Sequence, residues 1–288
     1  MLFGGTPVKS NNEFCIDFDS SKRSNYEAID LQIFISKDSI VYKLNDNEFN
    51  NYLLKLNKKL QKYHLIPYQL HSLWEFGDNK SDEEKNWDLI LPYYIKAIEG
   101  AHILGVKYVV IHHRFPFGYF ETEQTKNYGK ELNIKFLKKL LPYATKNDVT
   151  LCLENLPFDI EYSKINGTLS IIKSINDDHV KMCLDTGHLN CIEKDKDIYK
   201  WIKKIGSNLK CLHVHDNLGD GDYHLLPWQG SINWDDFTKG LKEINFDGCI
   251  SLETQSKKEN LSERCTENKL IIEKFKNLFD ELLDSKSK

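Results

Sequence analysis

The stretch CLHVHDNLGDGDYH, residues 211–224, concentrates side chains that can bind a divalent metal. It holds three histidines and three aspartates in fourteen residues. A solvated acidic loop and a calcium loop are the simplest alternatives. A calcium-binding EF-hand loop starting at Asp216 would place Gly221 correctly at its sixth position, but its twelfth position, which needs a bidentate acid, is Pro227. We therefore reject the calcium loop and look for further metal ligands elsewhere in the chain.

Metal-capable or acidic side chains also stand at the ends of other short apolar runs. A single charged residue in such a place usually caps an element or forms a salt bridge. Six runs end in this way. In chain order, the first ends with His71, the second with His112 and His113, the third with Glu154, the fourth with Asp185 and His188, the fifth with His213, His215 and Asp216, and the sixth with Glu253. Clustered carboxylates repel one another unless a cation compensates them. If these ends converge, the sequence indicates a metal site.

Eight β-branched, apolar runs alternate with amphipathic segments along the chain. They cover residues 1–7, 28–34, 65–73, 107–113, 150–156, 180–188, 209–216 and 248–254. Strict alternation predicts a parallel sheet, and continuous apolar runs indicate strands buried on both faces. Eight units in 288 residues favour one α/β domain over residues 1–288, a (β/α)8 TIM barrel with its active site at the C-terminal strand ends.

Helical periodicity predicts the elements between the strands. Residues 47–63 form a helix with one apolar face made of Phe49, Leu53, Leu56 and Leu60. Gly105 is placed to end a helix over residues 88–105. Residues 259–283 predict a last helix that covers the flank of the barrel. Residues 8–27 are polar and poorly periodic, so we expect a long loop there, with a short helix at most.

Charge and hydropathy limit the partners of the chain. It has 39 basic and 43 acidic side chains, a net charge of −4 and a mean hydropathy of −0.52. A negative net charge disfavours a nucleic-acid partner without excluding one, since a local basic patch is compatible with it. The sequence has no apolar run of about 18 residues and no signal-peptide pattern, so we expect no membrane partner and a cytoplasmic location. An oligomer is compatible with this composition.

The seven cysteines lack the CxxC spacing of a zinc ribbon or redox motif, which indicates reduced thiols. Side chains two residues apart on a strand share a face. Three of these cysteines stand two residues before a candidate ligand and a fourth stands four before Glu253, namely Cys152, Cys183, Cys211 and Cys249. We hypothesise that they fill the barrel interior directly beneath the site.

The segments LENLP, CLDTGHLN, HVHDN with DYHLLPWQGSINW, and SLET resemble the xylose-isomerase-like TIM barrel superfamily over about residues 65–254. The superfamily includes sugar and sugar-phosphate isomerases and epimerases, and also the endonuclease IV type of AP endonuclease. Resemblance to the epimerases implies one divalent metal held by Glu154, Asp185, His213 and Glu253. The two glutamates would also be catalytic, moving a proton through a metal-stabilised enediolate of a small-molecule sugar substrate.

The ligand set indicates the kind of metal. Three carboxylates and one imidazole favour Mn²⁺ or Zn²⁺, permit Mg²⁺ or Co²⁺ and disfavour a soft thiolate metal. Resemblance to the nuclease implies three Zn²⁺ instead, with five further ligands at His71, His112, His188, Asp222 and His224. In the isomerase alternative these five residues bind substrate or an additional metal. Leu225 stands where the nuclease form has a second histidine, which favours the isomerase, whereas LQIF in residues 31–34 is nuclease-like.

Other residues are candidates for binding the substrate. Trp74, Phe76 and Trp228 are candidates for an apolar wall against a sugar, whereas we expect Trp234 to pack in the core or rim. Arg114 follows His112 closely and is a candidate for binding a phosphate or carboxylate, with an exposed salt bridge as the alternative. His215 shares a strand face with His213, so we expect it to support the site from behind the ligands or at the substrate rim.

Overall fold

The structure is a computed structural model that describes residues 1–6, 16–74, 84–116 and 122–284. Its centre is a sheet of eight parallel strands. They are β1 (Leu2–Gly5), β2 (Ala28–Leu31), β3 (Ile66–His71), β4 (Tyr108–Ile111), β6 (Thr150–Glu154), β7 (Val180–Asp185), β8 (Leu209–His213) and β9 (Cys249–Leu252). Each of the eight apolar runs of the sequence contains one of these strands.

The sheet curls into a nearly closed barrel. Its strands follow the order β8-β7-β6-β4-β3-β2-β1-β9, and all neighbours are parallel. The two ends meet just beyond β8, where the Val214 N–H donates to the carbonyl of Ser251 at 2.8 Å and the Glu253 N–H donates to the carbonyl of Val214 at 3.1 Å. This confirms the predicted (β/α)8 TIM barrel, in which the carboxyl ends of all strands lie at one end.

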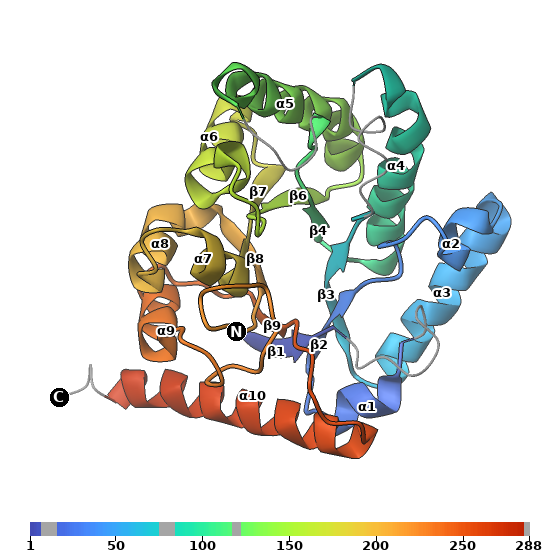
Figure 1. The fold of residues 1–288 in the computed structure, drawn as a ribbon. Coiled ribbons are helices and arrows are strands. Elements are labelled where there is room, and N and C mark those ends of the chain that lie inside the picture. The colour runs from blue at the N-terminus through green and yellow to red at the C-terminus, as the bar shows by residue number, and fades with distance from the viewer. Residues whose placement is uncertain (7–15, 75–83, 117–121, 285–288) are drawn as a thin grey trace.

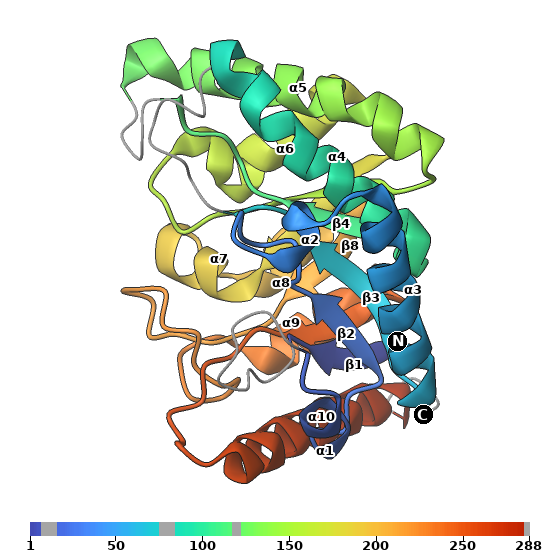
Figure 2. The ribbon, with the colours of Figure 1, turned by 90° about the vertical axis from the view of Figure 1, so that its right-hand side faces the viewer.

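Helices surround the strands, with α4, α5 and α6 on one side and α10 on the opposite side (Figures 1 and 2). The α-helices are α1 (Phe18–Arg23), α2 (Ile40–Lys43), α3 (Asp46–Lys62), α4 (Trp87–Leu104), α5 (Glu123–Lys146), α6 (Ile165–Ile175), α7 (Thr186–Ile192), α8 (Ile198–Ile205), α9 (Trp234–Glu243) and α10 (Leu261–Asp284). Short 3₁₀ turns cover Glu84–Asn86, Glu161–Ser163 and Gly206–Asn208. None of the described helices is long and apolar enough to cross a membrane.

The helix predictions are confirmed where the structure describes the chain. The four apolar residues expected on one face of α3 are all buried. Gly105 ends α4 with a φ of 72°, the left-handed conformation that glycine adopts without strain. α1 is the short helix expected in the first unit, while residues 7–15 lie outside the described part. α10 covers the flank between α9 and α1 (Figure 1).

A small cluster separate from the main core fills the barrel interior. It consists of Val110, Cys152, Cys183 and Cys211, with Tyr108 packed against it. These thiols are free and fully buried. The arrangement supports the hypothesis that cysteines lie beneath the site for three of the four residues. Cys249 is also buried, but it does not belong to this cluster.

Candidate metal centre

Four strand ends bring the predicted metal ligands together. Glu154, Asp185 and His213 are the last residues of β6, β7 and β8, and Glu253 directly follows β9. One ligand atom from each of these residues lies within 4.8 Å of all the others. The first three side chains are buried, whereas that of Glu253 is 19% exposed. Three carboxylates and one imidazole therefore converge, and Glu154 and Glu253 both line the cavity above them.

The imidazole of His213 tests whether this group suits a metal. Its Nε2 lies 3.0 Å from Oδ2 of Asp30, and its Nδ1 lies 3.0 Å from Oε1 of Glu154 and 3.3 Å from Oε2 of Glu253. A neutral imidazole has one N–H, so donation to Asp30 leaves a lone pair on Nδ1 that faces two carboxylates. That contact is favourable only with a proton or a metal cation between the atoms. The donor set therefore fits a divalent metal.

Backbone carbonyls orient three other histidines, as the carboxylate of Asp30 orients His213. In each of them Nδ1 lies within 2.8 Å of a carbonyl oxygen, in the pairs His71 with Ser72, His188 with Asn155 and His224 with Glu253. A carbonyl only accepts, so Nδ1 must carry the hydrogen and Nε2 is left to face the cavity. Metal-binding histidines are held in this way.

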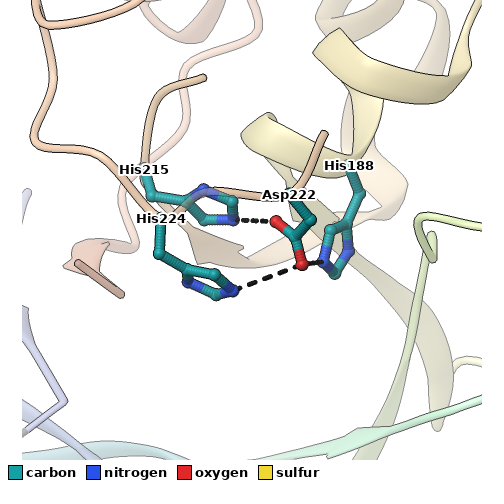
Figure 3. Close-up of side chains that lie close together, drawn as sticks. All are labelled: His188, His215, Asp222 and His224. Carbon is teal, nitrogen blue, oxygen red and sulfur yellow. Dashed lines mark ion pairs between the residues drawn. The ribbon is translucent and has the colours of Figure 1, made fainter. Parts of the chain in front are cut away.

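A second donor group surrounds Asp222, as Figure 3 shows. Its Oδ2 lies 3.3 Å from Nε2 of His188 and 3.4 Å from Nε2 of His224, and its Oδ1 lies 3.7 Å from Nε2 of His215. Burial lowers the pKa of His188, but Asp185 and Asp222 outweigh burial and raise that pKa to about 10. For His224, Asp222 likewise outweighs burial and raises the pKa to about 9. These positions demand positive charge, which a metal can supply in place of protons.

A third donor group shares Glu154 with the first. Oε2 of Glu154 lies 3.0 Å from Nε2 of His112 and 3.6 Å from Nε2 of His71, while Oε1 of Glu154 faces His213. Burial raises the pKa of Glu154, but His213 and His112 hold it well below its usual value. The carboxylate is therefore ionised and lies between two donor groups.

Cys183 is placed near the first group but is a poor ligand. Its sulfur lies within 4.8 Å of ligand atoms of Glu154 and His213. Burial raises the pKa of the Cys183 thiol well above its usual value, which opposes formation of the thiolate. Metal binding by cysteine requires the thiolate. We therefore keep the oxygen and nitrogen donors as the candidate ligands.

His215 lies behind the ligands. Its Nε2 lies 3.0 Å from Oδ1 of Asp185, and its ring stacks on that of His224 with centroids 4.0 Å apart. A Cβ on Gly187 would lie 1.9 Å from the His215 ring, so glycine is required there. His215 is fully buried and does not line the cavity. His215 is therefore not at the substrate rim, and it belongs to the second donor group through its contact with Asp222.

A cavity of about 660 Å³ opens above the donor groups. It is lined by His71, His112, Glu154, His188, Asp222, His224 and Glu253. Trp74, Leu156 and Phe158 add apolar surface to its walls. A cavity of this size, with converging polar groups and apolar walls, suits a small molecule. Of the predicted aromatic wall, Trp74 lines the cavity and Phe76 lies outside the described residues.

Two predicted substrate contacts are wrong. Arg114 is 2% exposed and does not line the cavity; its Nη1 donates to the hydroxyl of Tyr94 at 2.8 Å, and its guanidinium lies 5.5 Å from the centre of the Phe136 ring. Residues 112 and 114 would share a face only if the strand continued through them. Because β4 ends at Ile111, the side chain of Arg114 is not held on the same face as that of His112. Neither substrate binding nor an exposed salt bridge describes Arg114.

Trp228 also does not line the cavity. Its ring lies 4.7 Å from that of Phe275 on α10, and the ammonium group of Lys274 lies 4.0 Å from its centre. A backbone φ of 70° turns the chain at this residue, so the side chain packs against the last helix. Trp234 is 2% exposed, which confirms its expected place in the core.

Asp216 organises a loop and is not part of the donor groups. Its Oδ1 accepts hydrogen bonds from the N–H groups of Asn217 and Ile232, and its Oδ2 accepts from the N–H of Trp228 and Nε1 of Trp234. The side chain is fully buried. Asp216 ends its apolar run as the sequence indicates, but four N–H donors already satisfy both of its oxygens, so it is not placed to bind a metal.

We expect Asp216→Asn to lower the free energy of unfolding by about 2–4 kcal/mol, because the new amide group faces two N–H donors and leaves them unpaired. Urea denaturation measures the change. Asp220→Asn is the matched control, since Asp220 is exposed in the same loop and should change stability by less than about 0.5 kcal/mol. A similarly small change for Asp216→Asn would contradict the assigned role.

Three buried or half-buried residues that position the candidate ligands, directly or through one another, were not predicted from the sequence. Gln69 Nε2 donates to Oδ2 of Asp30 at 2.8 Å, and Gln32 Nε2 donates to Oε1 of Glu253 at 3.0 Å. Asp30 is 1% exposed and lies in the middle of an apolar strand. Burying a carboxylate in an apolar strand costs free energy unless the carboxylate is paired. The aspartate within the apolar run of residues 28–34 was therefore a signal in the sequence for a residue that supports the site.

The fold agrees with the family to which the chain belongs. Residues 18–278 match the xylose isomerase-like TIM barrel family, so this chain is a member of it. This family also includes endonuclease IV.

Relatives carry several different names. The uncharacterized protein MJ1311 of Methanocaldococcus jannaschii is 29% identical over 82% of this chain and 78% of its own length. The probable endonuclease 4 of Metamycoplasma arthritidis is 25% identical over 73% of this chain and 77% of its own. The inosose isomerase of Bacillus velezensis is 23% identical over 88% of this chain and 87% of its own length.

Solved structures share the fold. A D-tagatose 3-epimerase-like protein superposes with a TM-score of 0.75, covering 98% of this chain and all of its own at 21% identity. The IolI protein, whose structure contains a bound zinc atom, superposes with a TM-score of 0.68 at 22% identity, covering 92% of each chain. The structural neighbours are largely sugar epimerases and isomerases.

Proposed function

We propose that this protein is a divalent-metal-dependent isomerase or epimerase of a sugar or sugar phosphate. One observation carries the proposal: Glu154 and Glu253 reach a single four-donor group from different strands, at the floor of a cavity sized for a small molecule. The names of several relatives and structural neighbours support this class of reaction. Asp185 and His213 complete the group that would hold the metal.

The two glutamates suit proton transfer at a carbon atom. When bound, the metal would polarise the carbonyl of the sugar and acidify the neighbouring C–H group. One glutamate removes that proton and the other returns a proton to the substrate. Gln32 holds Oε1 of Glu253, and His213 and His112 hold the two oxygens of Glu154. General acid–base catalysis of this kind contributes about 10²–10⁴-fold to the rate.

Other cavity residues position the sugar. His188 lines the cavity with its Nε2 3.3 Å from Oδ2 of Asp222, and a substrate oxygen that enters beside Asp222 would contact it. Trp74 is 45% exposed and offers an apolar face to the C–H side of the sugar. The oxygen and nitrogen donors favour Mn²⁺ or Zn²⁺ and accommodate Mg²⁺ or Co²⁺. The zinc in the IolI structure agrees with this preference.

The proposal is tested with inosose, D-psicose and D-tagatose as substrates. We expect the metal-loaded protein to convert at least one sugar of a ketose panel built on these three into an isomer or epimer, detected by chromatography. Absence of conversion across the panel, together with cleavage of abasic DNA, would contradict it.

A phosphodiester hydrolase of the nuclease type is the second candidate. Its supporting observation is that all five additional ligand candidates lie in two further donor groups beside the first. Such a site would hold three zinc ions that activate water and stabilise a leaving oxygen. The net charge of −4 opposes it, since DNA affinity depends on phosphate contacts.

Metal content per chain separates the two candidates. We expect elemental analysis of purified protein to give one ion in the four-donor group for the isomerase, whereas three zinc ions would favour the nuclease. Cleavage of abasic DNA that is lost on Asp222→Ala would also support the nuclease, because Asp222 joins the second donor group.

Chelation of the metal is expected to lower the melting temperature by about 5–10 °C. A ligand present at 100 times its dissociation constant stabilises the folded state by about 2.7 kcal/mol, and each kcal/mol shifts melting by about 2–4 °C for a chain of this size. Differential scanning calorimetry with and without EDTA measures the shift. Asp185→Asn is the control, since loss of a donor should remove most of the response. If the wild-type protein melts at the same temperature with and without EDTA, metal binding is contradicted.

A further inference from the structure

The wall of the cavity formed by α10 carries a cation. Arg264, in the first turn of α10, lines the same cavity as Glu154 and Glu253. Among the described residues that line the cavity, it is the only lysine or arginine. The chain has three arginines, and the other two lie elsewhere: Arg23 is exposed outside the cavity, and Arg114 is buried against aromatic rings. Arg264 therefore gives this wall a charge opposite to that of the donor groups.

The guanidinium of Arg264 is held by one edge. Its Nε–H donates to the carbonyl of Lys258 in the loop between β9 and α10. Among the described residues no carboxylate forms an ion pair with Arg264, and Glu267, one turn further along α10, instead accepts a hydrogen bond from Ser256. Nη1 and Nη2 thus have no described partner. Together they form the planar fork that matches two oxygens of a carboxylate or phosphate.

The surroundings of Arg264 favour an anion. The neighbouring wall residues Thr254 and Asn268 are neutral: the hydroxyl of Thr254 donates to Oδ1 of Asn268, and Nδ2 of Asn268 donates to the hydroxyl of Tyr26. α10 is 24 residues long and begins at Leu261, so its positive dipole end lies within the same turn as Arg264. Figure 1 shows this end of α10 beside α1, at the point where the loop after β9 arrives.

We propose that Arg264 binds an anionic group on the sugar, so that the substrate is a ketose carrying a phosphate or a carboxylate away from the reacting carbon. This inference rests on the proposed sugar isomerase or epimerase activity and names its substrate class. The glutamate pair acts at one end of the substrate, and Arg264 fixes the other. Arg264 takes the role that the sequence pattern assigned to Arg114.

Binding to the metal-loaded protein tests the inference through three probes. D-fructose is neutral, D-fructose 6-phosphate carries a phosphate and D-fructuronate carries a carboxylate. We expect calorimetric titration to show at least tenfold tighter binding of one charged ketose than of D-fructose. Arg264→Ala should reduce that ratio to about one and leave D-fructose binding unchanged. Arg264→Lys should keep part of the preference, because it keeps the charge without the fork, and Arg23→Ala should keep all of it.

Each outcome separates this inference from the proposed function. A preference for the charged ketose that survives Arg264→Ala would overturn the inference, since the anion would then bind elsewhere, for example at the metal. Failure of wild type to bind either charged ketose more tightly than D-fructose would also overturn it. Proton exchange in D-fructose without any such preference supports the activity alone. An Arg264-dependent preference without proton exchange supports the anion site and contradicts the activity.

Discussion

Replacement of Glu154 by glutamine is expected to slow proton exchange at the carbon next to the carbonyl of a bound ketose by about 10²–10⁴-fold. The glutamine amide cannot accept a proton from carbon. It also presents an N–H group to His112 or His213, whose nitrogens lie 3.0 Å from the two oxygens of Glu154. The rate should be measured at saturating metal, with the metal content of the variant determined in parallel, so that a lost ligand is distinguished from a lost base.

Glu193→Gln is the matched control for this substitution. Glu193 is a buried glutamate that accepts a hydrogen bond from the N–H of Ile165 at 2.9 Å and does not line the cavity. We expect it to keep nearly the full rate. If Glu154→Gln turns over sugar at the wild-type rate, Glu154 is not the general base and the assignment of the glutamate pair is wrong.

Asp30→Asn is expected to weaken metal binding by about 10–100-fold, the usual effect of losing the partner of a metal-binding histidine. The carboxylate of Asp30 accepts from Nε2 of His213 and thereby directs the lone pair of Nδ1 toward Glu154 and Glu253. An amide removes the charge that makes the imidazole a stronger base. Competition with a chromophoric chelator measures the dissociation constant.

The melting temperature of the metal-free variant separates a positioning role from a structural one. A positioning role weakens metal binding while the metal-free protein melts close to wild type. A purely structural role for Asp30 would lower the melting temperature of the metal-free protein and leave the affinity for metal unchanged. Gln69→Leu provides a second check, since it removes the other donor to Asp30 and should weaken metal binding less.

The barrel and the strand ends that carry the candidate ligands could be predicted because both follow from local periodicity. Alternation of strand and helix determines the fold class, and residues such as Glu154 and Asp185 end strands whose apolar character is plain. The positions of Cys152, Cys183 and Cys211 followed from the two-residue period of a strand. Each of these inferences needs only the sequence immediately around the residue.

The errors arose where a side chain leaves the regular strand. Arg114 follows the end of β4, and Trp228 adopts a left-handed backbone conformation, so neither obeys strand alternation. Asp216 contacts residues up to eighteen positions away, and Asp30 contacts His213 across 183 positions. Such pairings depend on barrel closure and on loop paths, which local patterns do not encode. Arg264 faces the cavity for the same reason, since its approach depends on how α10 docks.

Deuterium incorporation from heavy water tests the central proposal most directly. The metal-loaded protein would be incubated in D₂O with inosose, D-psicose, D-tagatose and D-fructose 6-phosphate, and each sugar examined by NMR. We expect deuterium at a carbon next to the carbonyl in at least one sugar, no incorporation after chelation, and recovery when the metal is restored. Incorporation that persists without metal, or none in any sugar from a protein that cleaves abasic DNA, would contradict a metal-dependent proton transfer between Glu154 and Glu253.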